Sequence, residues 1–170
     1  MEESISVVVL GPQDWRDLRA IRLEALRSEP AAYSSSFEET LARSDEHWQQ
    51  RLASDHSVHL LARAQSRPIG MVGGYLGSDE GDESVAVVFG MYVAREYRGR
   101  GIGRLLLSSL IDRLSAFPQI CTIRLGVTET QDPARALYES MGFQVIGKTE
   151  EGIVVDDRQV DELIMELRVR

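Results

Sequence analysis

The apolar residues of this chain recur at two spacings that alternate along the sequence. In the first long segment, Trp15, Leu18, Ile21 and Ala25 lie three or four residues apart, which predicts a helix that runs to about Arg27. Other segments are short runs rich in valine, isoleucine and leucine, a composition that favours strands. These runs predict seven strands, at residues 5–10, 57–64, 69–76, 85–93, 122–127, 143–147 and 160–169.

Three further helices are predicted between these strands. They lie around residues 47–52, from about residue 102 to Pro118, and from Asp132 to Met141. The first helix should stop at Glu29, because the residue before a proline avoids the helical conformation, and residues 31–39 are expected to form a loop. Asp132 followed by proline is typical of a helix start, with the aspartate as N-cap, and Gly142 is a natural stop.

The run at residues 85–93 differs from the others because it is apolar on both of its alternating faces. This pattern predicts a central strand that is covered on both sides. The chain contains no repeat and no linker rich in proline, glycine or serine. We therefore expect residues 1–170 to form one α/β domain.

The composition of the chain bears on its cellular location and on the kinds of partner it can bind. The sequence begins with acidic residues, has no apolar run long enough to span a bilayer, and holds one cysteine, Cys121, which together predict a cytoplasmic protein without a membrane partner. The net charge of −8 argues against a nucleic-acid partner. It is compatible with a cationic partner such as a polyamine or basic peptide, although solubility alone is the simpler explanation of the charge. The histidines lack metal-ligand spacing, so no metal site is expected.

One segment reverses the acidic balance. Residues 95–104 contain four arginines and a single acid, Glu96, which gives a local charge of +3. Gly99, Gly101 and Gly103 lie in the same segment, between the apolar strand and the next helix. The first N–H groups of a helix lack intrahelical partners and point outward, and glycine lets a ligand approach the backbone closely. The segment therefore predicts a site for phosphate groups.

Two other phosphate-binding motifs do not fit these residues. A P-loop needs lysine followed by serine or threonine after its last glycine, whereas Arg104 and Leu105 follow Gly103 here. A dinucleotide-binding motif needs a further glycine and an acid on the next strand, but residues 99–104 read GRGIGR and residues 122–127 read TIRLGV.

Two motifs in sequence order resemble those of the GNAT acetyltransferase family. Residues 98–103, RGRGIG, are similar to its coenzyme A signature R/Q-x-x-G-x-G/A, and Ala134 to Phe143 resemble its block A-x-x-L-Y-x-x-x-G-F. The order of predicted helices and strands over residues 5–169 is also similar to the family's. The resemblance implies a mixed, mostly antiparallel sheet of six or seven strands flanked by about four helices. It also implies acetyl-coenzyme A as co-substrate.

The resemblance assigns the cofactor site. It implies that the backbone around Tyr92 binds the pantetheine arm and that the amides of the glycine-rich turn hold the pyrophosphate. Gln131 stands where the family often has asparagine and keeps the amide group. The implied cofactor residues are Met91, Tyr92, Val93, Arg98, Gly99, Arg100, Gly101, Ile102, Gly103, Arg104 and Gln131.

The same resemblance implies that Tyr138 protonates the leaving thiolate, with a packed helix aromatic as the alternative.

The general base is less defined. Many relatives carry a glutamate at the position of Phe89, and no acid lies between residues 85 and 93 here. A primary amine with a pKa near 10.4 is only about 0.04% neutral at pH 7, so a base is desirable. Glu83 is predicted to be the general base, with Asp82, Glu38 and Glu39 as alternatives.

The acceptor pocket is predicted to involve Tyr33, Phe37, Glu38 and Phe89. The acceptor is expected to be an amine, which leaves polyamines, amino acids, aminoglycosides and protein N-termini open. Because Phe89 and Gln131 depart from the family pattern, an acetyl-coenzyme A sensor without turnover is the alternative function. Many members of the family form dimers, so a homodimer is also left open.

Overall fold

The computed structural model describes residues 3–78, 80–155 and 157–170, apart from the side chains of residues 150–153 and 155. Its strands are β1 (Ile5–Val9), β2 (Ser57–Ala64), β3 (Arg67–Leu76), β4 (Val85–Val93), β5 (Thr122–Thr128), β6 (Gln144–Val155) and β7 (Arg158–Arg168). Its α-helices are α1 (Trp15–Ser28), α2 (Phe37–Leu41), α3 (Asp45–Ala53), α4 (Ile102–Ser115) and α5 (Asp132–Ser140). Short 3₁₀ helices cover Pro12–Asp14, Pro30–Ala32 and Arg95–Tyr97.

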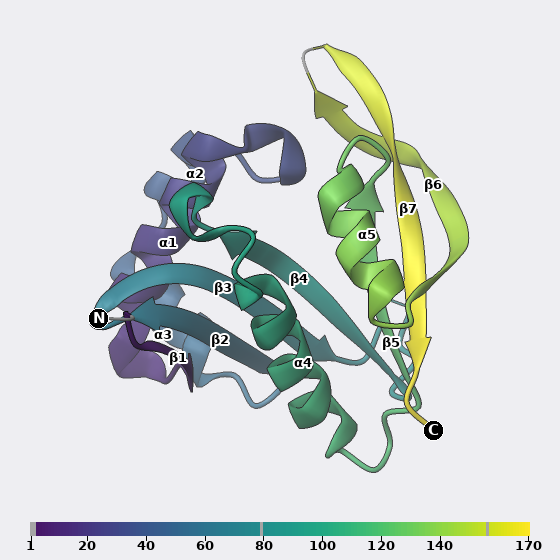
Figure 1. Ribbon diagram of the computed structural model, residues 1–170, viewed down its shortest axis with the longest axis horizontal. Coiled ribbons are helices and arrows are strands. Elements are labelled where there is room, and N and C mark those ends of the chain that lie inside the picture. Colours follow the sequence, from purple (N-terminus) through teal and green to yellow (C-terminus); the bar gives the residue numbers. More distant parts are fainter. Residues whose placement is uncertain (1–2, 79, 156) are drawn as a thin grey trace.

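The strands form one mixed sheet in the order β1-β2-β3-β4-β5-β7-β6. Only β4 and β5 pair in parallel, and the other neighbours are antiparallel. Helix α4 packs on one face of β1 to β4, and α1 and α3 pack on the opposite face, while α5 lies beside β5 and β7 (Figure 1). The seven-stranded mixed sheet confirms the predicted α/β fold class.

The core follows from the apolar repeats in the sequence. Trp15, Leu18, Ile21 and Ala25 are all buried on α1, as their spacing predicts. On β4, Val85 and Ala86 are both buried, and because adjacent residues of a strand point to opposite faces, this strand is covered on both sides. These contacts hold β4 in the middle of the sheet.

The central pair of strands separates halfway along its length. Residues 85–88 of β4 pair with residues 122–125 of β5, and the pairing stops there. On its other side, β4 has an irregular register opposite β3 between Phe89 and Tyr92, and Gly90 has a φ of 66°. A bulge of this kind adds a residue to one strand and increases its twist. Figure 1 shows the two strands together near the C-terminus of the chain and apart at their other ends.

Several predicted boundaries need correction. Five α-helices are present rather than about four, because residues 37–41 form α2 in the segment expected to be a loop. The hydroxyl of Ser36 accepts a hydrogen bond of 3.1 Å from the Glu39 N–H, which caps this helix. Helix α5 starts at Asp132 with Gln131 in the N-cap position, one residue earlier than predicted.

Strands β6 and β7 form the last hairpin, and both extend further toward its turn than their apolar residues indicate. Strand β6 ends at Val155 and β7 begins at Arg158. Backbone pairing with β7 continues across the polar residues of β6, with two shifts of register. Within the described residues, no helix is long and apolar enough to cross a membrane.

Candidate functional site

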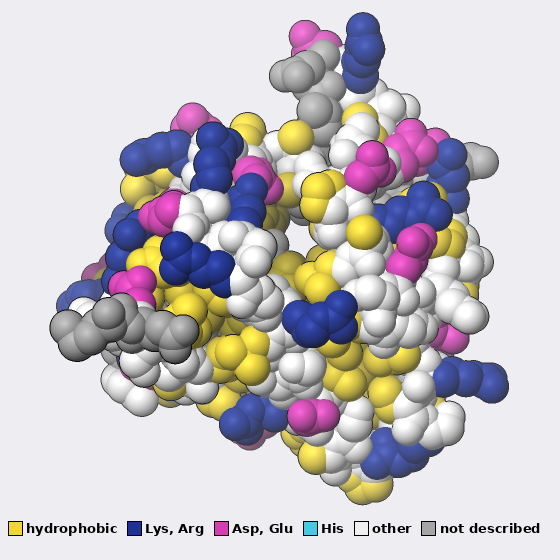
Figure 2. Space-filling view, in the orientation of Figure 1, with side chains coloured by type: hydrophobic (Ala, Val, Ile, Leu, Met, Phe, Trp, Pro, Cys, Tyr) yellow, Lys and Arg dark blue, Asp and Glu magenta, His cyan; other side chains and the backbone are white. Residues whose placement is uncertain are grey.

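The separation of β4 from β5 opens a pocket of about 480 Å³. Its walls are the C-terminal half of β4, the end of β5, the glycine-rich turn, the start of α5 and the segment around Tyr33. Figure 2 shows the surface hollowed between the two halves of the molecule, where β4 and α5 face each other in Figure 1. Because residues 89–93 lack a β5 partner, no strand pairs with their backbone groups on this side, although the carbonyls of Met91 and Val93 accept hydrogen bonds from the side chains of Tyr33 and Arg98.

The glycine-rich turn forms the end of the pocket. Gly99 and Gly101 have φ values of 75° and 78°, which favour glycine, and a Cβ atom at either would meet no protein atom within 4 Å. Gly101 is the N-cap of α4, and no side chain caps that helix. The N–H groups of its first turn are therefore free to bind an anion, which fits the phosphate site predicted from the sequence.

The arginines of the turn do not all face the pocket. Arg98 and Arg104 line it, whereas Arg100 lies outside the lining with its guanidinium 5.1 Å from the centre of the Tyr97 ring. Arg98 donates to the Val93 carbonyl at 2.8 Å and pairs with Glu29 at 2.6 Å. Arg98 therefore fixes the turn against β4 in addition to adding positive charge beside it.

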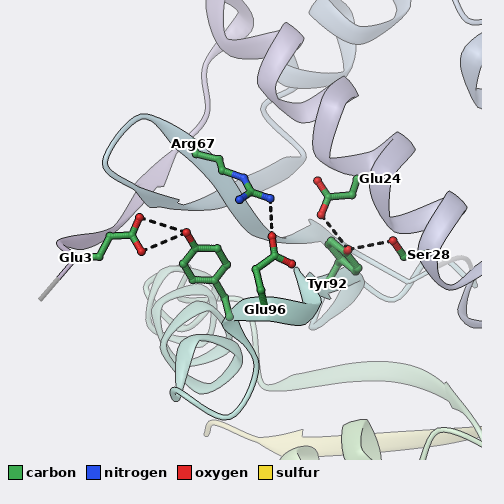
Figure 3. A network of polar contacts seen from close by, with 7 residues as sticks. Glu3, Glu24, Ser28, Arg67, Tyr92 and Glu96 are labelled. Carbon is green, nitrogen blue, oxygen red and sulfur yellow. Dashed lines mark hydrogen bonds and ion pairs between the residues drawn. The ribbon is translucent and has the colours of Figure 1, made fainter.

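Polar contacts hold this turn in place from outside the pocket. Figure 3 shows Arg67 paired with Glu96 at 2.6 Å, which ties β3 to the 3₁₀ helix before the turn. It also shows the Tyr92 hydroxyl, which donates to Glu24 of α1 at 3.1 Å. The tyrosine side chain therefore serves to anchor β4, and the backbone of Tyr92 pairs with Met71 of β3.

Tyr138 projects from α5 into the wall of the same pocket. The residue is 6% exposed, and its ring centre lies 6.1 Å from that of Phe143. Its hydroxyl makes no hydrogen bond to any residue that the structure describes, and burial raises its pKa to about 12. Tyr138 is therefore protonated at neutral pH and has a proton to donate. Gln131, at the start of α5, also lines the pocket.

The predicted acceptor residues fall into two groups. Tyr33 and Phe89 line the pocket, and the Tyr33 hydroxyl donates to the Met91 carbonyl at 2.9 Å. Phe37 and Glu38 lie outside the lining, on α2, where the Arg27 guanidinium covers the Phe37 ring at 4.9 Å.

The structure does not bring Glu83 to the pocket. Glu83 is exposed and precedes the first residue of β4, whereas the pocket lies beyond Val88 at the other end of that strand. Phe89 lies six positions further along this extended segment, or roughly 20 Å away. Asp82 lies at the same end, where it accepts hydrogen bonds from Ser84.

Two acids that the sequence did not single out do line the pocket, Glu29 and Glu162. Glu29 is already paired with Arg98. Glu162 lies on β7, its side chain packs over Gly126 of β5, and burial raises the pKa of its carboxyl group. Glu162 comes from β7, the last strand of the chain, and the pairing of β5 with β7 brings it here. No local motif marks it.

Comparison with known proteins agrees with this geometry. Residues 15–143 match the acetyltransferase (GNAT) family. The chain belongs to the GNAT family of acetyltransferases. The family uses acetyl-coenzyme A, and the open turn, the free helix N-terminus and the unpaired edge of β4 fit that co-substrate.

Two curated GNAT relatives cover most of the chain. The sequence is 33% identical to the N-alpha-acetyltransferase RimI of Mycobacterium tuberculosis over 137 residues, 77% of this chain and 83% of that protein. It is 26% identical to the L-amino acid N-acetyltransferase AaaT of Escherichia coli over 164 residues, 95% of this chain and 98% of that protein. Among solved structures, Arabidopsis thaliana NAA60 in complex with acetyl-CoA has a similar fold, with a TM-score of 0.75, 18% identity, and 98% and 99% of the two chains covered.

Proposed function

We propose that this acetyltransferase moves the acetyl group of acetyl-coenzyme A to a primary amine by direct attack, with both substrates bound together. The observation that carries the proposal is one continuous pocket that joins the anion-binding turn to Tyr138. A pocket of this kind can hold a phosphate-bearing ligand and a second substrate in contact, so no acetylated form of the enzyme is needed.

The co-substrate is held by backbone groups more than by side chains in this proposal. The amides of residues 98–104 bind the pyrophosphate, with Arg104 and Arg98 beside them. The backbone of residues 91–93 bonds the pantetheine arm as an added strand on the edge that β5 leaves free, chiefly through the N–H groups of Met91 and Val93, because the backbone of Tyr92 pairs with β3. Gln131 offers its amide to the same arm.

Tyr138 acts as the general acid. As the amine nitrogen bonds to the thioester carbonyl, the carbon–sulfur bond breaks and the Tyr138 hydroxyl gives its proton to the sulfur. The proton that the amine loses returns to the tyrosine oxygen through solvent, so the products are an acetamide and free thiol. The raised pKa of Tyr138 keeps this proton in place before the reaction.

Glu162 is the acid best placed to act as general base. It lines the pocket, and among the described residues its carboxylate forms no ion pair. Its raised pKa makes it a better proton acceptor than an exposed glutamate. It therefore takes the role that Phe89 cannot perform, by accepting a proton from the bound ammonium group directly or through water.

The test is turnover with a panel of primary amines. Thiol release is followed with amino acids, polyamines, aminoglycosides and short peptides at saturating acetyl-coenzyme A, and each product is identified by mass spectrometry. We expect at least one class to give one acetylated amine per thiol released. Binding of acetyl-coenzyme A without acetylation of any amine would favour the sensor function instead.

A further inference from the structure

A second, smaller cavity of about 20 Å³ lies on the α1 and α3 side of β4. It shares Phe89 and Gly90 with the large pocket, so the two spaces adjoin at these residues. Two arginines line it, Arg22 from α1 and Arg51 from α3. Both are only partly exposed.

These arginines have no counter-charge in the part of the chain that the structure describes. Among the described residues, neither Arg22 nor Arg51 has a carboxylate within 4.0 Å, whereas Arg63, Arg98 and Arg124 each have at least one. Burial lowers the pKa of both guanidinium groups, and the nearby charge of Arg43 lowers it further. A buried cation without an acid is costly, so a cluster of this kind calls for an anion that the protein itself does not supply.

Two further polar atoms of the cavity wall have no hydrogen-bond partner among the described residues. They are Trp48 Nε1 and His59 Nε2, and both are buried. Indole N–H is a donor only, and guanidinium groups only donate. The cavity therefore presents hydrogen-bond donors from α1 and α3 and no carboxylate, which is the chemistry of an anion site.

The cluster touches the part of β4 where the two substrates must meet. A Cβ atom on Gly90 would lie 3.3 Å from Arg22 Nη1, and the Arg22 guanidinium lies 4.7 Å from the centre of the Tyr33 ring. The Arg51 guanidinium lies 5.3 Å from the centre of the Phe89 ring. The guanidinium group of Arg22 therefore lies against Gly90, the residue before Met91. This part of β4 is where we expect the acceptor to bind.

We propose that the acceptor is a small amine that carries a carboxylate next to its amino group, a free α-amino acid, and that Arg22 and Arg51 bind this carboxylate. This inference rests on the proposed acetyl transfer and names its substrate class. The amino group then faces the interior of the large pocket, which Glu162 also lines. An amino acid meets a base at one end and two guanidinium groups at the other.

The alternatives fit these charges less well. A polyamine would place further positive charge beside unpaired arginines, in spite of the net charge of −8 of the whole chain. A protein N-terminus has lost the carboxylate beside its amino group to a peptide bond. The small cavity holds about one water molecule, so the anion binds at its mouth, where the flexible arginine side chains can turn toward it.

The test compares free L-amino acids with their amides, which keep the amine and the side chain but lack the negative charge. We expect the parent protein to have a kcat/KM about 10- to 100-fold higher for the free acid, the range for charge-assisted hydrogen bonds. Arg22→Gln and Arg51→Gln should each bring this ratio close to one. Arg16→Gln, an exposed arginine of α1 stacked on Trp15, is the matched control and should keep the ratio of the parent.

A second measurement needs no variant. A 2-hydroxy acid, which has the carboxylate but no amine, should inhibit the parent competitively against the amino acid, and its amide should not. Equal or better turnover of amides, dipeptides or polyamines would overturn the inference while acetyl transfer stands. Failure of every amine, with no thermal shift from acetyl-coenzyme A, would overturn the proposed function and the inference together.

Discussion

The hydroxyl of Tyr33 donates a hydrogen bond of 2.9 Å to the carbonyl oxygen of Met91, 58 residues further along the chain. This contact ties the segment after α1 to β4 at the irregular part of the strand. The same tyrosine ring lies beneath Arg22. One residue therefore joins the arginine cluster, the bulge of β4 and the wall of the large pocket.

Removing the Tyr33 hydroxyl should lower the stability of the fold. Tyr33→Phe keeps the ring but leaves the Met91 carbonyl without its donor, so we expect the free energy of unfolding to fall by about 1 kcal/mol. Urea unfolding measures this change. An unchanged midpoint would mean that water replaces the hydroxyl at no cost and that the contact does not organise the pocket.

The glycine-rich turn has a matched control elsewhere in the chain. Gly101 and Gly77 both have positive φ, and at both a Cβ atom would meet no protein atom within 4 Å. Gly101→Val and Gly77→Val should therefore lose similar stability through backbone strain, roughly 1–2 kcal/mol.

Only Gly101→Val should weaken the binding of acetyl-coenzyme A, because its side chain would occupy space where the pyrophosphate approaches. Isothermal titration of both variants measures the dissociation constants. Equal affinity in the two would place the pyrophosphate away from this turn.

The proposed acid and base give a specific pH dependence. Glu162, whose pKa is raised by burial, must be ionised to accept a proton, so kcat/KM should fall as pH drops toward that pKa. Tyr138, with a pKa of about 12, stays protonated and should cause no loss of activity between pH 7 and 10.

Glu162→Gln keeps the size of the side chain and removes the base. We expect it to lower kcat/KM by about 10²-fold or more and to abolish the acid limb of the profile. An unchanged profile would exclude Glu162 as the base.

His59 should make the fold sensitive to acid. Burial lowers its pKa from 6.5 to about 4, so between these values the unfolded chain binds more protons than the folded one. Its contribution is fully present above about pH 6.5 and is lost as pH falls toward 4, by about 3 kcal/mol in total.

His59→Gln should reduce the difference in unfolding free energy between pH 7 and pH 4, whereas the exposed His56→Gln should not. Denaturant titrations at the two pH values measure both. Parallel curves for the parent and His59→Gln would contradict the burial of a neutral imidazole.

Local patterns were enough to predict most of the fold and the place of the glycine-rich turn. The spacing of Trp15, Leu18 and Ile21, and the two-sided apolar run of β4, depend on neighbours in sequence. The coenzyme A signature is likewise continuous. Helix α2 was missed because it is held by a short capping contact from Ser36 rather than by an apolar repeat.

The acceptor side could not be predicted in the same way. Arg22, Arg51 and His59 come from α1, α3 and β2, and nothing in their local sequence shows that they share a cavity. Glu83 is close to β4 in sequence but lies at the wrong end of it, and Glu162 is distant in sequence but reaches the pocket through β7. Both outcomes depend on strand order and direction.

The most direct test of the proposed chemistry is the turnover of Tyr138→Phe. This variant keeps the packing against Phe143 and removes only the hydroxyl. With an amine identified from the panel and both substrates saturating, we predict that kcat falls by about 10²–10⁴-fold while the affinity for acetyl-coenzyme A stays within a few-fold of the parent. A kcat within threefold of the parent, in a step shown to be limited by chemistry, would contradict Tyr138 as the acid that protonates the leaving thiolate.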